Sequence, residues 1–179
     1  LFLRAMGKAQ QMCANCWGGG QIDWTTGEVI PCICKKYREP ICAFIDVEGT
    51  WDADWSRRLG VNPDKVLLSV PEYAEQSLDI VEVLLRSAEV DIITLDSIAF
   101  LTPAKEIEES SGKALQAEQA RTIGRGVRKF VSALNWVGNK TGRRPTLFFT
   151  NQVRMKLNVM YGNPETQPGG FGPGFSATA

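Results

Sequence analysis

The sequence predicts an α/β protein with a mainly parallel central sheet flanked by helices, and three observations support this prediction. Two apolar runs lead to acids: residues 42–48 end in Glu48, and residues 90–97 reach Asp96 just before Ser97. A third apolar run, residues 146–150, ends before the polar pair Asn151 and Gln152. Between these runs, apolar residues recur at helical spacing in residues 75–86. Continuous apolar runs suit strands that are buried on both faces, and intervening helices suit parallel connections.

The other elements are predicted from apolar spacing and from residues that end helices. Residues 1–11 and 52–59 are predicted to be helical, with Trp51 and Trp55 on one face of the second helix. A short strand follows at 66–70, and a long helix at 114–134 leads to a basic, turn-prone connection at 140–145. Residues 104–112 fit either a solvated helix end or a loop. Residues 160–170 contain too much Gly and Pro for regular structure, which favours a functional loop.

Size and charge indicate one substantial domain. The chain has 179 residues, 44% of them hydrophobic, and its 20 basic and 20 acidic residues cancel. Nucleic-acid binding would therefore need a local basic patch. No apolar run reaches the length of a membrane span, and we expect a cytoplasmic protein. The chain opens inside a helical pattern and stops in a Gly-rich run, so we expect truncation at both ends.

Four of the five cysteines lie close together in a turn-rich segment. Thiolates in two pairs can supply four tetrahedral ligands to a structural zinc ion, which would order a segment that has no core of its own. The second pair has one intervening residue, tighter than usual zinc spacing, so free thiols or a redox pair stay open. The candidate zinc ligands are Cys13, Cys16, Cys32 and Cys34.

Acids at the ends of two predicted strands indicate a site at one edge of the sheet. In an open α/β sheet, ligands bind at the carboxyl ends of the strands. Asp96 can hold a hydrated metal ion there, and Glu48 can polarise a water molecule if its strand lies alongside. Either acid could instead cap a turn. Gln152, after the third apolar run, could sense a terminal phosphate through a neutral amide.

Basic residues on the long predicted helix could follow a phosphate backbone. Arg121, Arg125 and Arg128 are spaced to share one helix face, and Lys129 is adjacent. A solvated basic face explains the same pattern equally well.

Six stretches, in this order and spacing, resemble one known family. They are CAFIDVE at 42–48, VDIITLDS at 90–97, LTP at 101–103, EIE at 106–108, NQVRMK at 151–156 and MYGNPET at 160–166. Together they make residues 42–170 similar to the RecA family of ATP-dependent DNA recombinases. The resemblance implies a RecA-like core that binds ATP and Mg²⁺ and coats single-stranded DNA as a homo-oligomeric helical filament. It also implies pairing and strand exchange with homologous duplex DNA, in DNA recombination and repair.

The resemblance assigns roles to the nucleotide-site residues. Asp96 matches the acid that holds Mg²⁺ through water, and Glu48 matches the acid that activates the attacking water. Gln152 matches the amide that links the terminal phosphate to a DNA-binding loop. Asp52 and Trp55 match adenine contacts, and Ser97 belongs to the nucleotide site.

The resemblance also assigns DNA-binding residues. Residues after Pro103 match the first DNA-binding loop, and residues from Met160 onward match the second. The implied DNA-binding set is Arg121, Arg128, Lys129, Arg154, Lys156, Met160, Gly162, Asn163, Glu165, Thr166, Gly169 and Gly170.

Among several departures from the family pattern, such as the end at residues 171–175 and a longer basic connection at 140–144, two bear on the site and the domain organisation. The phosphate-binding motif is absent, although residues 1–11 resemble the helix that follows it, so we expect the motif to lie upstream of Leu1. We therefore expect the 179 residues alone to bind ATP poorly. Residues 12–40 form a Cys-rich insertion within a partial core that spans residues 1–179. Two alternatives stay open: a non-enzymatic, zinc-stapled DNA-binding or interaction module on this scaffold, and a helicase-type ATPase.

Overall fold

The computed structural model describes residues 1–14, 38–108, 113–155, 165–168 and 173–174. This part of the chain contains helices, short 3₁₀ turns and two sheets. The helices are α1 (Phe2–Gln10), α2 (Ala53–Arg58), α3 (Ala74–Ser87), α4 (Ala104–Glu108) and α5 (Lys113–Thr141), and the 3₁₀ turns are η1 (Pro63–Lys65) and η2 (Ile98–Phe100). The strands are β1 (Cys42–Asp46), β2 (Val66–Ser69), β3 (Ile92–Asp96), β4 (Thr146–Phe149), β5 (Arg154–Met155) and β6 (Glu165–Thr166).

Four of these strands form a parallel sheet in the order β2-β1-β3-β4. The central pair aligns Cys42 with Ile92 and Asp46 with Asp96, so β1 and β3 end at the same level. Every residue of β1 is buried, as are the first four of β3. The predicted fold class, a parallel α/β core, is confirmed.

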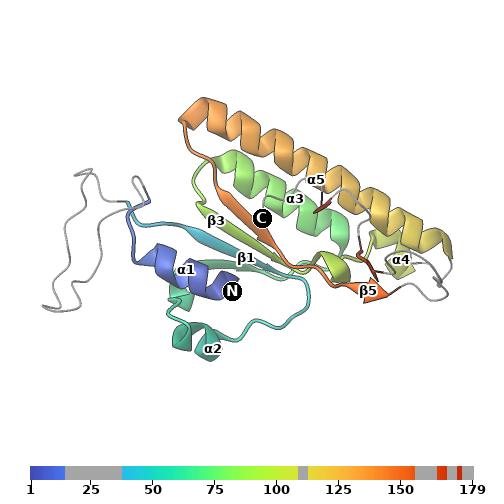
Figure 1. Ribbon diagram of the computed structural model, residues 1–179, viewed down its shortest axis with the longest axis horizontal. Helices are drawn as coiled ribbons and strands as arrows, with labels where there is room; N and C mark the ends of the chain where they lie inside the picture. Colours follow the sequence, from blue (N-terminus) through green and yellow to red (C-terminus); the bar gives the residue numbers. More distant parts are fainter. Residues whose placement is uncertain (15–37, 109–112, 156–164, 169–172, 175–179) are drawn as a thin grey trace, which may run out of the picture.

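Helices cover both faces of this sheet (Figure 1). On one face, Ile45 and Ile93 pack in a core with α3 and α5. On the other face, Phe44 packs in a second core with Met6 of α1. Side chains of a strand alternate between faces, so one buried strand feeds both cores.

The long helix α5 extends seven residues beyond its predicted end at residue 134. Ala133 and Val137 are buried and continue the apolar stripe that packs on the sheet and α3. Gly142 then adopts a positive φ of 71° and ends the helical path. The predicted basic connection at 140–145 therefore begins inside the helix.

Two further predictions were wrong in detail. Trp51 lies before α2 because the Asp52 side chain caps that helix, accepting from the Trp55 N–H at 2.9 Å. The Trp51 ring packs on Phe44, with centroids 4.8 Å apart, whereas Trp55 is exposed. The segment expected to lack regular structure contains β6, which pairs antiparallel with β5. A distant partner strand supplies its hydrogen bonds, which local composition does not reveal.

Gly7 of α1 lies against the backbone of the turn after α2. A Cβ at Gly7 would lie 2.6 Å from the Gly60 carbonyl carbon and 2.9 Å from the Val61 nitrogen. Backbone atoms cannot move aside as a flexible side chain can. The close approach of α1 to this turn therefore requires glycine.

We expect Gly7→Ala to destabilise the fold by about 1–3 kcal/mol, because overpacking outweighs the helix preference for alanine. Gly124→Ala is the matched control, since a Cβ there meets only the Arg128 side chain, at 3.7 Å. The control should be neutral or stabilise by up to about 1 kcal/mol. Urea unfolding measures both. Equal effects of the two substitutions would contradict the close approach.

Candidate active site

Two acids lie close together at the carboxyl edge of the sheet. Asp96 is the last residue of β3, and Glu48 lies two residues beyond the end of the adjacent strand β1. The Val47 N–H donates to the Asp96 carbonyl oxygen at 2.8 Å, which continues the strand pairing toward Glu48. Parallel pairing thus places both predicted site acids at one edge.

Each acid accepts a hydrogen bond from a neutral hydroxyl. Ser97 Oγ donates to Glu48 Oε1 at 2.5 Å, and Thr150 Oγ1 donates to Asp96 Oδ1 at 2.5 Å. Ser97 is buried and follows Asp96 through a cis peptide bond. Thr150 immediately follows β4. Three adjacent strands therefore contribute to one polar cluster of Glu48, Asp96, Ser97 and Thr150.

The donor atoms of this cluster fit a hydrated Mg²⁺ ion. Within the described residues, no lysine or arginine forms an ion pair with Glu48 or Asp96. Asp96 Oδ2 accepts no hydrogen bond from that part of the chain and stays available. Carboxylate oxygens are the ligands that Mg²⁺ prefers, whereas sulfur and imidazole are not.

The polar residues after β4 extend the same edge. Gln152 is exposed, and its backbone N–H donates to Asn151 Oδ1 at 2.9 Å. Asn151 Nδ2 donates to the Pro168 carbonyl at 3.1 Å. Asn151 thus connects the end of β4 to the segment that follows the β5–β6 hairpin. Among the described residues, Gln152 forms no hydrogen bond with Asp96 or Glu48.

The predicted adenine residues lie at the start of α2. Asp52 is exposed, and its side chain accepts the Trp55 N–H as a helix cap. The Trp55 side chain is 54% exposed, which leaves its ring open to a stacking partner.

Three arginines on α5 share one exposed face, as predicted. Arg121, Arg125 and Arg128 line a shallow, open pocket together with Glu118 and Gly124. Arg121 and Arg125 pair with Glu118, at 3.7 and 3.4 Å, whereas Arg128 forms no ion pair within the described residues. Arg128 is therefore the most available cation of this face.

Lys129 points away from the arginine face. Its ammonium lies 2.9 Å from Glu82 and 3.2 Å from Asp79, both on α3. The hydrogen bonds that Lys129 donates to Glu82 and Asp79 raise the pKa of Lys129, and hydrogen bonds from Lys129 and Arg86 lower the pKa of Glu82. Lys129 is thus held by α3, and its DNA contact stays a prediction.

The remaining predicted DNA residues divide between the small β5–β6 hairpin and segments outside the described residues. Arg154 is exposed on β5, and Glu165 and Thr166 form β6. Register aligns Arg154 with Thr166. The predictions for Lys156, Met160, Gly162, Asn163, Gly169 and Gly170 lie outside the described residues.

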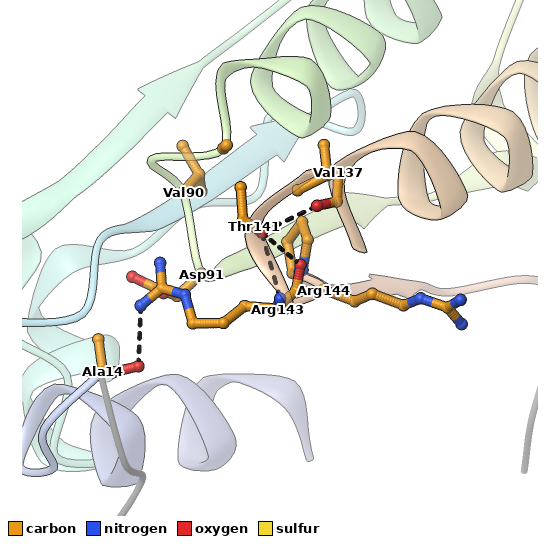
Figure 2. A pocket seen from close by; sticks show the side chains of 9 residues that line it. Ala14, Val90, Asp91, Val137, Thr141, Arg143 and Arg144 are labelled. Carbon is orange, nitrogen blue, oxygen red and sulfur yellow. Dashed lines mark hydrogen bonds and ion pairs between the residues drawn. The ribbon is translucent and has the colours of Figure 1, made fainter. Parts of the chain in front are cut away.

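The stem of the predicted insertion lies at the opposite edge of the sheet, near the start of β3. The Ala14 N–H donates to the Arg38 carbonyl at 2.8 Å, so the chain re-enters beside the point where it left. Arg38 pairs with the buried Asp91, whose other oxygen accepts the Ile41 N–H at 3.0 Å. Arg143 donates to the Ala14 carbonyl at 3.2 Å (Figure 2). The stem is thus fixed to the core.

The predicted zinc ligands are only partly described. Cys13 is buried at the stem, whereas Cys16, Cys32 and Cys34 lie outside the described residues. Within the described ranges, no group of three or more potential ligand side chains is arranged to hold a metal ion. Burial, with a smaller effect of Asp91, raises the pKa of Cys42 to about 12, so the fifth cysteine stays a neutral thiol.

Two residues that shape the two edges, Thr150 and Asp91, were not singled out from the sequence. Thr150 stands at a strand end, directly before the polar pair Asn151 and Gln152, and its polar side chain was the available signal. Asp91 lay inside an apolar run, and its position before the strand start could have indicated a structural acid.

Parallel strands that deliver acids to one edge, with helices on both faces, define an α/β protein with a candidate ligand site at the carboxyl ends of its strands. Residues 20–178 match the family model described as "RecA N-terminal domain". The chain therefore belongs to the RecA family.

Curated relatives support this membership. The protein named "Protein RecA" from Deinococcus radiodurans is 47% identical over 129 residues, which is 72% of this chain and 34% of the relative. The one from Petrotoga mobilis is 44% identical over 138 residues, 77% of this chain and 36% of the relative. The one from Rhodopseudomonas palustris is 38% identical over 153 residues, 85% of this chain and 42% of the relative. The chain thus spans about a third to two fifths of the length of these relatives.

None of the helices in the described ranges is both long enough and apolar enough to cross a membrane.

We expect Asp91→Asn to destabilise the fold by about 2 kcal/mol or more, because a buried acid loses its charge beside Arg38 and Arg143. Glu39→Gln is the control, because it weakens the exposed pair of Glu39 with Lys65 and should cost less than about 1 kcal/mol. Chemical denaturation measures both free energies of unfolding. A loss for Asp91→Asn no larger than that for Glu39→Gln would show that the stem is not held by Asp91.

Proposed function

We propose that this chain is part of an ATP-dependent, cytoplasmic recombinase. It coats single-stranded DNA as a homo-oligomeric helical filament and exchanges strands with homologous duplex DNA in recombination and repair. The observation that carries the proposal is the pair Glu48 and Asp96, each oriented by a hydroxyl at the carboxyl edge of the sheet. Family membership supports DNA recombination over the two alternatives, a non-enzymatic zinc-stapled module and a helicase-type ATPase.

Each residue of the edge has a proposed role in ATP hydrolysis. Asp96 would hold Mg²⁺ through water, and bound Mg²⁺ would neutralise charge on the phosphates. Glu48 would orient and deprotonate the attacking water, with Ser97 fixing its carboxylate. Gln152 would sense the terminal phosphate and pass that state to the hairpin through its neighbour Asn151. Asp52 and Trp55 would contact adenine.

The domain organisation is part of the proposal. Residues 1–179 form a partial RecA-like core, and residues 12–40 form a Cys-rich insertion within it. The bond from Ala14 to Arg38 supports an insertion that leaves and returns at one point. A structural zinc ion on Cys13, Cys16, Cys32 and Cys34 stays a prediction. The sequence lacks the phosphate-binding motif, so the 179 residues alone would bind ATP weakly.

The proposed DNA path follows the exposed face of α5 and the β5–β6 hairpin. Arg121, Arg128 and Arg154 supply exposed positive charge along it. The second-loop residues after Met155 complete the proposed path.

In the protein that carries this sequence, we expect Glu48→Gln to lower DNA-stimulated ATP turnover by about a hundredfold or more, because the amide cannot accept a proton. ATP-dependent filament formation should persist, as seen by electron microscopy. Glu89→Gln, an exposed acid at the opposite edge of the sheet, is the control and should hydrolyse ATP normally. Near-normal turnover by Glu48→Gln would refute the assignment of Glu48.

For DNA, we expect Arg128→Ala to weaken single-stranded DNA binding similarly for all sequences. The slope of log affinity against log salt concentration should fall by about one, because one phosphate contact is lost. Arg86→Ala on α3, which removes an exposed arginine paired with Glu82, is the matched control. Fluorescence anisotropy at several salt concentrations measures both. An unchanged slope for Arg128→Ala would remove Arg128 from the proposed DNA path.

A further inference from the structure

Thr150 contacts the proposed metal-binding acid, and neither the family match nor the sequence motifs assign it a role. Its hydroxyl donates to Asp96 Oδ1 at 2.5 Å. The contact joins the ends of two adjacent parallel strands, β3 and β4. Thr150 therefore lies where it can fix the orientation of the Asp96 carboxylate.

The backbone of Thr150 is held on both sides by the Asp96 segment. Its N–H donates to the Leu95 carbonyl at 3.2 Å, and its carbonyl accepts the Ile98 N–H at 3.0 Å. These bonds continue the β3–β4 ladder past the last strand residue, Phe149. A threonine side chain is also stiff at χ1 because it is branched at Cβ. The hydroxyl is thus placed by the sheet itself.

The bond to Oδ1 leaves the two Asp96 oxygens in different environments. Oδ1 is occupied by Thr150, and Oδ2 accepts no hydrogen bond within the described part of the chain. An arginine or lysine would offset the carboxylate charge. A neutral hydroxyl fixes the carboxylate plane and leaves that charge in place. The free oxygen therefore keeps both its charge and its direction for a metal-bound water.

We infer that Thr150 is a positioning residue for Mg²⁺, which orients Asp96 so that Oδ2 faces the metal-bound water. This inference rests on the proposed function, because it assigns Asp96 to Mg²⁺. Thr150 acts through Asp96 and touches neither nucleotide nor metal. Loss of its hydroxyl lets the carboxylate rotate, which weakens metal binding.

The test compares Thr150→Val, Thr150→Ser and the unchanged protein that carries this sequence. Valine keeps the shape and removes the hydroxyl, whereas serine keeps the hydroxyl. Thr141→Val is the matched control, because Thr141 donates to the Val137 carbonyl at the far end of α5. Thermal unfolding midpoints check that each variant folds. If Thr150→Val does not fold, Thr150→Ala takes its place in the test.

The first readout is the Mg²⁺ concentration that half-saturates DNA-stimulated ATP hydrolysis. We expect Thr150→Val to raise it about ten- to hundredfold, the loss typical when a residue that hydrogen-bonds a metal ligand is removed. Thr150→Ser and Thr141→Val should stay within about twofold of the unchanged protein. The second readout is Mn²⁺ binding with a slowly hydrolysed ATP analogue, measured by electron paramagnetic resonance. Mn²⁺ should bind more weakly to Thr150→Val than to the unchanged protein, and about as tightly to Thr150→Ser and Thr141→Val as to the unchanged protein.

The two readouts separate the inference from the proposed function. If the unchanged protein hydrolyses ATP and Thr150→Val has its normal metal requirement, the role of Thr150 is refuted and the function stands. If the protein does not hydrolyse ATP but Thr150→Val still weakens Mn²⁺ binding, the function fails and the role of Thr150 stands. Equal losses for valine and serine, or no Mn²⁺ binding by the unchanged protein, also overturn the inference.

Discussion

The parallel pairing of β1 with β3 is the constraint on which the rest of the structure depends. It aligns Asp46 with Asp96, so that both strands end at one level and Glu48 follows beside Asp96. A parallel pair needs a crossover connection, and α2, η1, β2 and α3 supply it. Because β1 and β3 are central, both of their faces must be covered, which α1 and the α3–α5 pair achieve. One register therefore determines both the core and the site.

The end of β4 connects that site to the small hairpin. Thr150 bonds Asp96, and the next residue, Asn151, bonds the Pro168 carbonyl after β6. Two consecutive residues at the end of β4 thus contact Asp96 and the segment after β6. Because Thr150 and Asn151 are adjacent in the chain, a shift of this strand end would affect both contacts.

Much of the fold could be predicted from the sequence because its signals are local. The apolar runs and the spacing of Leu78, Val81 and Leu85 report burial directly, and the structure confirms the strands and helix α3. The acids at strand ends were found for the same reason. Register, caps and distant pairing are not local. Asp52 caps α2, so the helix begins at Ala53 and Trp51 lies before it, and β6 exists only through its pairing with β5.

Asp91 and Asp96 show why the site could not be completed from the sequence. They stand five residues apart in one apolar run, yet their partners differ in kind. Asp91 lies at the edge where β3 begins and is paired with Arg38 and Arg143, so its charge is used within the fold. Asp96 lies at the edge where β3 ends and is held by the neutral Thr150 hydroxyl, so its charge remains available. An arginine neutralises the acid it positions, whereas a hydroxyl positions the acid and leaves it charged. The partner, which only the tertiary structure reveals, separates the structural acid from the acid suited to a cation.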